Sequence, residues 1–207
     1  MIDVLLVDDH AVVREGYRRL LELQLDMRVV GEAGDGEDAL RLWRALRPAV
    51  LVVDLALPGL GGIELITRLR QRDPASRCLA FSMYRDEVWV LQALRAGALG
   101  YVTKSSPPGE LVRAVREVHA GRRVLSADLE AVSEADTGET GPHGLSPREF
   151  EVLRALVGGR SVREIADQLC LSVKTVHNIH YQIKAKLQTT SDFDLARLAW
   201  RRGWLEA

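Results

Sequence analysis

Four short apolar runs in the first half of the chain each end in a polar or charged side chain. Asp8 and Asp9 follow the first run, Asp54 the second, Ser82 the third and Lys104 the fourth. In an open parallel sheet the carboxyl ends of the strands line one crevice, and ligands bind there. We therefore expect three carboxylates, a hydroxyl and an ammonium group to meet at one edge of a sheet, although they are far apart in the chain.

Runs rich in β-branched residues alternate with amphipathic stretches through the first 120 residues. Strands are expected at 4–7, 29–33, 50–54, 78–82 and 100–103, separated by segments whose apolar residues recur at helical spacing. Strict alternation of strands and helices favours a parallel sheet with helices on both faces. We expect residues 1–121 to form an α/β domain with a doubly wound, five-stranded parallel sheet of the flavodoxin-like type.

Residues 122–143 interrupt this pattern. Residues 133–144 are polar and contain glycine, and they cannot bury enough apolar surface to offset the entropy lost on ordering them. No Lys or Arg lies between residues 124 and 143, where the acids are Asp128, Glu130, Glu134, Asp136 and Glu139. We expect a flexible acidic linker over 122–143, with a domain on each side.

The last part of the chain is helical throughout. Two Ser-x-x-Glu capping boxes, at Ser146 and Ser161, mark helix starts. A third helix is expected over about 173–187 and a fourth from about 191. A short helix, a tight turn and a longer helix with one polar face describe a helix-turn-helix. We therefore expect an all-α, four-helix domain over 144–207.

The third expected helix has two distinct faces. Val176, Ile179, Ile183 and Leu187 recur at the spacing of a buried stripe. The other side is polar, and in a helix-turn-helix that side enters the major groove of DNA. Its candidate base-facing residues are His177, Asn178 and Tyr181, and its candidate phosphate contacts are Lys174, Thr175, Lys184 and Lys186. A solvated polar face without a ligand explains the same pattern.

The strand-end group has a chemistry of its own. Adjacent acids and a third acid brought beside them repel each other unless a cation intervenes, and Mg²⁺ prefers carboxylate, carbonyl and water oxygens. A cation beside Asp54 would also orient a phosphoryl group for attack by that carboxylate. Lys104 would offer an ammonium group and Ser82 a hydroxyl to phosphoryl oxygens. Each residue also has an ordinary interpretation: Asp8 and Asp9 as a helix cap, Lys104 as a surface lysine, and Ser82 as a satisfied hydroxyl.

Composition and cysteine positions indicate the cellular compartment. No apolar stretch approaches the roughly 18–20 residues of a membrane span, so no membrane association is expected. Asp3, Asp8 and Asp9 interrupt any apolar leader at the start. Cys78 and Cys170 are far apart and lie in apolar runs, which is typical of buried free thiols in a reducing compartment. We expect a cytoplasmic protein.

Residues 1–120 resemble the receiver domain of bacterial two-component response regulators. The resemblance implies that Asp54 accepts a phosphoryl group from a sensor histidine kinase and that Mg²⁺ (or Mn²⁺) is the cofactor. The implied ligands are Asp9, Asp54 and the backbone carbonyl of Ala56, with Asp8 acting through water. The matching stretches are Leu5–His10, Val53–Gly62, Phe81–Tyr84 and Gly100–Lys104.

The same resemblance implies a switch pair, in which Ser82 moves toward the phosphoryl group and Tyr101 turns inward behind it. Lys104 would contact the phosphoryl oxygens. For Tyr101 the alternative is an ordinary half-buried strand aromatic. Ala56 and Tyr84 occupy positions that influence how fast water attacks the acyl-phosphate. Because Ala56 offers no polar group to orient that water and Tyr84 is bulky, we expect a fairly long-lived phosphoryl state.

Residues 144–207 resemble the LuxR-type helix-turn-helix that defines the NarL/FixJ class of response regulators. This resemblance implies a homodimer when the protein is phosphorylated, with a contact on the fourth helix through Leu195, Leu198 and Ala199. His177 replaces a basic base-facing residue common in the class, so an operator sequence cannot be borrowed from relatives. The matching stretches are Leu145–Leu153, Ser161–Ala166, Leu171–Val176 and Lys186–Leu187.

Together these features favour a phosphorylation-controlled transcription factor that binds double-stranded DNA and is not an enzyme. One alternative is a Mg²⁺-dependent phosphohydrolase with Asp54 as its nucleophile. Such enzymes usually have a second acid two residues after the nucleophile, where this chain has Ala56, and they would have no use for the helical domain. Another alternative is a protein that binds DNA regardless of phosphorylation.

Overall fold

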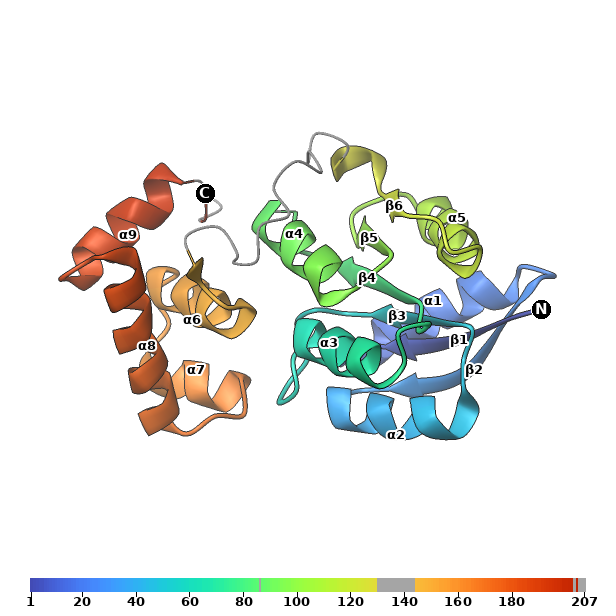
Figure 1. The fold of residues 1–207 in the computed structure, drawn as a ribbon, viewed down its shortest axis with the longest axis horizontal. Coiled ribbons are helices and arrows are strands. Elements are labelled where there is room, and N and C mark those ends of the chain that lie inside the picture. The colour runs from blue at the N-terminus through green and yellow to red at the C-terminus, as the bar shows by residue number, and fades with distance from the viewer. Residues whose placement is uncertain (86, 130–143, 203, 205–207) are drawn as a thin grey trace. The chain divides into compact units, whose positions relative to one another are not determined.

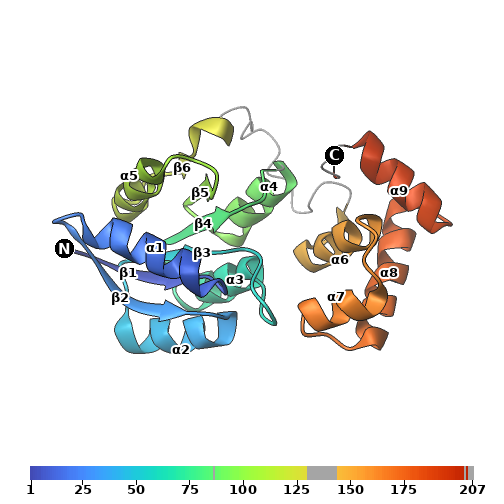
Figure 2. The ribbon, with the colours of Figure 1, turned by 180° about the vertical axis from the view of Figure 1, so that it is seen from behind.

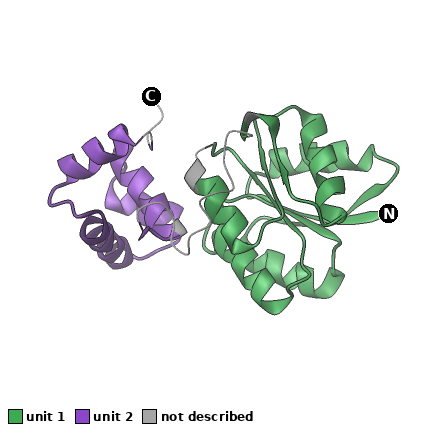
Figure 3. Cartoon of the chain, turned by 45° about the horizontal axis from the view of Figure 1, so that its top comes forward, with its two compact units in different colours: residues 1–137 green, residues 138–207 purple. Residues whose placement is uncertain are grey.

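A computed structural model describes residues 1–85, 87–129, 144–202 and 204. The chain divides into two compact units, residues 1–137 and residues 138–207 (Figure 3). The first unit contains the sheet and the second is helical (Figure 1). This agrees with the expected fold class of an α/β domain followed by an all-α domain.

The sheet of the first unit is parallel throughout and has the strand order β2-β1-β3-β4-β5-β6. Chain order reverses at β1, which lies between β2 and β3, and such a reversal creates a crevice at the carboxyl ends of the strands. The strands are β1 Ile2–Val7, β2 Met27–Ala33, β3 Val50–Val53, β4 Cys78–Ser82, β5 Gly100–Thr103 and β6 Val124–Leu125.

Five helices cover the two faces of this sheet (Figure 2). Helices α1 and α5 pack on one face, where Val4 and Leu6 meet Leu111 and Val115 in a continuous apolar core. Helices α2, α3 and α4 lie along the other face. The helices are α1 Ala11–Glu22, α2 Gly36–Leu46, α3 Gly62–Arg72, α4 Glu87–Ala96 and α5 Pro108–His119.

Among the described residues the sheet has six strands, which corrects the expectation of five. Strand β6 runs parallel to β5, with Val124 opposite Gly100 and Leu125 opposite Tyr101. A Cβ at Gly100 would lie 2.6 Å from Val124 Cγ1, so the missing side chain permits this close approach. A strand of two residues is too short to give a recognisable alternation in the sequence.

The first residues expected in the linker are therefore part of the first unit. After β6, the Ser126 backbone N–H donates to Tyr101 O at 3.0 Å, and the Ser126 hydroxyl accepts from the Thr103 N–H at 3.3 Å. Leu129, in the 3₁₀ turn Ala127–Leu129, is buried. The rest of the predicted acidic linker, residues 130–143, lies outside the described residues.

The second unit has four helices among its described residues: α6 Pro147–Val157, α7 Val162–Gln168, α8 Val173–Leu187 and α9 Asp192–Arg201. Both predicted capping boxes are present, at Ser146 and Ser161, and α8 has the predicted bounds. Helix α8 packs against α6 and α7, and its buried stripe includes Val176 and Ile183. Phe150 meets Trp204 edge-to-face, with ring centroids 5.5 Å apart.

One buried carboxylate connects α6 to α8. Glu149 Oε2 accepts from the Ser146 N–H at 2.6 Å, which closes the capping box, and from Lys186 Nζ at 2.7 Å. Burial opposes ionisation of Glu149, but the contacts with Lys186 and Ser146 outweigh it and hold the pKa of this carboxyl below its usual value. Sequence reasoning identified the cap but missed the ion pair, because the pairing of α6 with α8 is a tertiary contact.

Replacing Glu149 with alanine is expected to lower the free energy of unfolding of the second unit by about 2 kcal/mol, since a cap and a buried hydrogen-bonded charge are lost together. Because the pKa of Glu149 is lower in the folded state than in the unfolded one, its stabilisation is present above about pH 4.5 and is lost as the pH falls through the folded value. Hydrogen exchange of α6 and α8 amides against pH measures both effects. Glu164→Ala, at the exposed second box, is the matched control and should cost less; an equal cost would contradict the role of the Lys186 pair.

The cysteines differ from one another. Cys78 is buried, and burial raises the pKa of its thiol to about 12. Cys170 is exposed, which corrects the expectation that both are buried. It lies in the turn between α7 and α8, with φ of 50°. Within the described part of the chain, no helix is long and apolar enough to cross a membrane.

Candidate functional sites

A lysine and two carboxylates form a buried cluster at the carboxyl ends of β1, β3 and β5. Lys104 Nζ donates to Asp8 Oδ2 and to Asp54 Oδ2, each at 2.6 Å. The exposed fraction of these side chains is 7% for Lys104, 7% for Asp8 and 3% for Asp54. Residues 96 and 50 positions apart are thus brought into direct contact, as the strand-end pattern predicts.

The backbone around Asp54 is closely packed. Helix α3 begins at Gly62, where a Cβ would lie 2.1 Å from the carbonyl oxygen of Asp54. The Gly62 N–H donates to Leu55 O at 3.1 Å, and the Ala56 N–H donates to Asp54 Oδ1 at 3.2 Å. The turn after β3 therefore fixes the direction of the Asp54 carboxylate, with Oδ2 toward Lys104 and Oδ1 toward the Ala56 amide.

The charges in this cluster are unbalanced. Burial raises the pKa of the Asp54 carboxyl, Lys104 opposes that rise, and the nearby charge of Asp8 adds to it. Burial disfavours the charged form of Lys104, but Asp54 and Asp8 more than offset this and hold its pKa above the usual value. A single ammonium group thus faces two buried acids, with Asp9 beside them. An added divalent cation would relieve the remaining repulsion.

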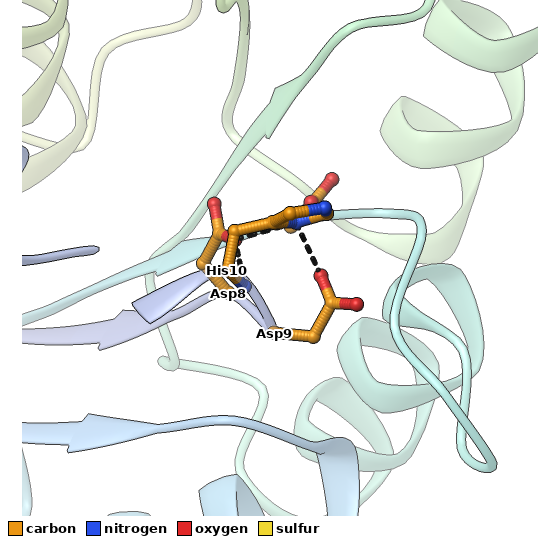
Figure 4. A group of neighbouring side chains, drawn as sticks. Asp8, Asp9 and His10 are labelled. Atoms are coloured by element: carbon orange, nitrogen blue, oxygen red, sulfur yellow. Dashed lines mark hydrogen bonds and ion pairs between the residues drawn. The ribbon is translucent and has the colours of Figure 1, made fainter. Parts of the chain in front are cut away.

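Asp9 and His10 lie next to Asp8 after the end of β1, as Figure 4 shows. His10 Nδ1 lies 2.7 Å from Asp9 Oδ1 and 3.4 Å from Asp8 Oδ1. One potential ligand atom from each of Asp8, Asp9, His10 and Asp54 falls within 4.8 Å of the others. This donor set fits a divalent cation. His10 did not emerge as a candidate from the sequence, although its position directly after two acids was an available signal.

The expected switch residues lie beside the cluster on β4 and β5. Ser82 is fully buried, and its hydroxyl accepts weakly from the Tyr84 N–H at 3.4 Å. Tyr101 is also fully buried, and its hydroxyl donates to Tyr84 O at 2.8 Å. The Tyr84 ring in turn stacks on Trp89, with centroids 4.5 Å apart and planes 13° from parallel. Tyr101 is therefore already turned inward and is more than the half-buried aromatic considered as an alternative.

The exposed side of α8 is the candidate nucleic-acid interface. Lys174, His177, Asn178 and Tyr181 are all exposed, and Tyr181 is 76% accessible despite its large ring. Thr175 differs from these residues because its hydroxyl lies 2.8 Å from that of Ser172, and its N–H donates to the same Ser172 hydroxyl at 3.0 Å. Thr175 thus contributes to the N-terminal cap of α8 as well as to this surface.

The other two candidate phosphate contacts are lysines held in ion pairs. Lys184 Nζ lies 2.6 Å from Asp192 Oδ1, and Lys186 Nζ lies 2.7 Å from Glu149 Oε2. Asp192 also accepts from His180 Nε2 at 2.8 Å, if that ring nitrogen holds its proton. These pairs stabilise the packing of α8 against α9 and α6, so neither lysine is as available to a phosphate as Lys174.

The candidate dimer residues on α9 need correction. Leu195 and Ala199 are 1% and 0% exposed, because they pack in the core of the second unit, and Leu198 is half-buried. Leu195 and Ala199 are therefore too deeply buried to contact a partner subunit, whereas the contact predicted for the half-buried Leu198 stays a prediction. The exposed apolar residues of α9 are instead Phe193 and Trp200, at 75% and 69%. Both faces of this helix contain large apolar side chains, which is why helical periodicity alone did not separate core from surface.

A buried acid–lysine cluster on a parallel sheet, joined to a helix-turn-helix unit, defines the class of two-domain regulators. Residues 4–116 match the response regulator receiver domain, and residues 143–199 match the bacterial regulatory proteins of the luxR family. The chain belongs to the two-component response regulators, in the NarL/FixJ class.

Similar proteins cover all or nearly all of the chain. The response regulator GacA of Pseudomonas aeruginosa is 37% identical, over 100% of this chain and 99% of its own. The response regulator UvrY of Escherichia coli K12 is 36% identical, over 100% and 97%. RcsB from Salmonella enterica serovar Typhimurium, bound to promoter rprA in the presence of the phosphomimetic BeF₃⁻, is 30% identical with a TM-score of 0.68, over 95% of this chain and 98% of that one.

Proposed function

We propose that this response regulator is phosphorylated on Asp54 by a sensor histidine kinase and that phosphorylation controls dimerisation and sequence-specific binding to DNA. The observation that supports this most directly is the contact of Lys104 with Asp8 and Asp54 in a buried cluster. The test is whether phosphorylation and DNA affinity rise together and are lost together in Asp54→Asn.

The residues at the crevice have separate roles in phosphoryl transfer. The Asp54 carboxylate attacks the phosphorus atom of the donor, and the bond from phosphorus to its leaving group breaks as the acyl-phosphate forms. Lys104 neutralises charge on the phosphoryl oxygens and Ser82 donates a hydrogen bond to one of them. Asp9, Asp54 and the Ala56 carbonyl would hold Mg²⁺ or Mn²⁺, with Asp8 acting through water. The bound cation would orient the phosphoryl group and offset its charge.

The product of this chemistry is a change in the protein itself, so we propose a regulator and not an enzyme with an outside substrate. Ala56 supplies no acid to protonate a leaving group, and the second unit offers a DNA-reading helix that a phosphohydrolase would not need. A DNA-binding role also supports the cytoplasmic location that we propose. The alternative of DNA binding without phosphorylation gives no function to the buried cluster of Lys104, Asp8 and Asp54.

The residues that we propose for the dimer contact differ from those that the class resemblance implies. We propose that the phosphorylated homodimer contacts itself through Phe193 and Trp200, which lie seven residues apart on one face of α9 and are exposed. Large exposed aromatic side chains are typical anchors of protein interfaces.

Replacing both Phe193 and Trp200 with serine is expected to weaken dimerisation of the phosphorylated protein by about 10-fold or more, because two aromatic anchors are removed. Sedimentation velocity over a range of protein concentrations measures this. Because both sites are exposed, we expect this variant to remain folded, as measured by circular dichroism. Leu195→Ser, in the core, is expected to destabilise the unit. An unchanged dimer would show that the contact lies elsewhere.

The acyl-phosphate is expected to persist for minutes to hours and not for seconds. Ala56 offers no group to orient an attacking water, and Tyr84 is fixed beside the crevice by its stack on Trp89. Loss of radiolabel from the purified phosphoprotein measures the lifetime. Ala56→Asn should shorten it several-fold by adding a polar group, whereas decay of the wild-type label within seconds would contradict the expectation.

A further inference from the structure

We propose that His10 is a nitrogen ligand in the cation site and that it lets the site bind transition-metal dications such as Co²⁺, Ni²⁺ or Zn²⁺ in competition with Mg²⁺. The proposal extends the cation site of the proposed function and depends on it. Its basis is the position of the His10 ring, whose Nδ1 lies 2.7 Å from Asp9 Oδ1 and 3.4 Å from Asp8 Oδ1.

The spacing of these atoms suits a shared cation. Two neighbouring ligands that each bind a metal at about 2.1 Å lie about 3 Å apart, and opposite ligands lie about 4.2 Å apart. The candidate atoms of Asp8, Asp9, His10 and Asp54 all fall within 4.8 Å of one another. The separations are therefore close to those that ligands of one shared cation require.

The backbone holds His10 over the acids. His10 is the N-cap residue of α1, with extended dihedrals of φ −87° and ψ 99°, and its N–H donates to Asp8 Oδ1 at 2.8 Å. This tight turn directs the ring back across the end of β1. The ring is 65% exposed, so an incoming ion can reach Nδ1 from solvent.

Lys104 contacts one oxygen of each buried acid, and the other oxygens, Asp8 Oδ1 and Asp54 Oδ1, accept from the backbone N–H groups of His10 and Ala56. The described contacts of Asp9 Oδ1 are with His10. An ion beside Asp9 would meet carboxylate oxygens and one imidazole nitrogen. Imidazole favours Zn²⁺, Ni²⁺ and similar ions, whereas Mg²⁺ prefers oxygen ligands and gains little from it. His10 therefore adds affinity for one class of dication only.

Isothermal titration of the full-length protein with Co²⁺ and with Mg²⁺ tests this. His10→Ala is expected to weaken Co²⁺ binding by about 10–100-fold, the range typical when a metal site loses a supporting group, and to change Mg²⁺ binding by less than about 2-fold. His177→Ala removes another exposed histidine, on α8, and should change neither. A Co²⁺ affinity that is the same in wild type and His10→Ala would overturn the proposal.

Proton NMR of the Co²⁺-loaded protein gives a direct test. A histidine bound through Nδ1 should give a strongly shifted ring Cδ2–H resonance, which does not exchange with water and is absent in His10→Ala, and the absence of this resonance from the wild type would overturn the proposal. Asp9→Asn separates the two ideas. If it leaves Mg²⁺ binding intact, the proposed cation site itself is wrong. If it abolishes Mg²⁺ binding while His10→Ala alters nothing, only the role of His10 is wrong.

Discussion

Asp54→Asn is expected to abolish phosphorylation of this protein by a small acyl phosphate such as acetyl phosphate. The asparagine amide is not a nucleophile toward phosphorus, and the hydrogen bond of Lys104 to Asp54 Oδ2 is lost or weakened. Phosphate-affinity electrophoresis and intact mass measure the result. Wild type should gain one phosphoryl group when Mg²⁺ is present, and the variant should gain none.

A matched carboxylate makes this result specific. Asp73 lies at the C-terminal end of α3, outside the crevice, and Asp73→Asn should be labelled like wild type. Removal of Mg²⁺ with a chelator should suppress the wild-type label, because the repulsion between Asp9, Asp54 and the incoming phosphate is then unrelieved. Retention of a label on Asp54→Asn, at the same stoichiometry, would mean that another residue is the acceptor.

Substitutions on the exposed side of α8 are expected to separate DNA specificity from DNA affinity. Asn178 is exposed at the centre of that side, and an asparagine can pair bidentately with adenine. Asn178→Ala should cost about 1–3 kcal/mol on the preferred sequence and relax the preference at one base position. Lys174→Ala should weaken binding to all sequences alike and reduce the salt dependence by about one ion.

Lys184→Ala is an informative comparison for Lys174→Ala. Because Lys184 is already paired with Asp192 at 2.6 Å, its loss should change the salt dependence less and the stability of the second unit more. Fluorescence anisotropy on selected DNA fragments, at several salt concentrations, distinguishes these outcomes. If Asn178→Ala binds every fragment with wild-type affinity and preference, α8 is not the reading helix.

Local sequence patterns were sufficient to predict most of the architecture. The strands β4 and β5 and helix α8 have the predicted bounds, because alternation, caps and helical spacing are properties of neighbouring residues. Strand β6 could not be predicted in this way. Its two residues form a strand because they pair with β5, and the absence of a side chain at Gly100 permits that close approach.

The candidate sites were likewise predictable only in part. Asp54 and Lys104 could be placed together because parallel strands bring their carboxyl ends to one edge. The burial of Leu195 and Ala199 and the pairing of Lys186 with Glu149 depend on which helices pack together, and no local pattern specifies that. The inward position of Tyr101 likewise depends on a carbonyl seventeen residues away, at Tyr84.

The measurement that tests the central proposal most directly is selection of DNA from fragmented genomic DNA by the full-length protein. Wild type and Asp54→Asn are each incubated with Mg²⁺, with and without acetyl phosphate, and the retained fragments are sequenced. We predict that acetyl phosphate enriches a discrete set of sites sharing one motif for wild type, and that Asp54→Asn shows no such enrichment. The same sites enriched equally by both proteins, regardless of acetyl phosphate, would contradict control of DNA binding by phosphorylation of Asp54.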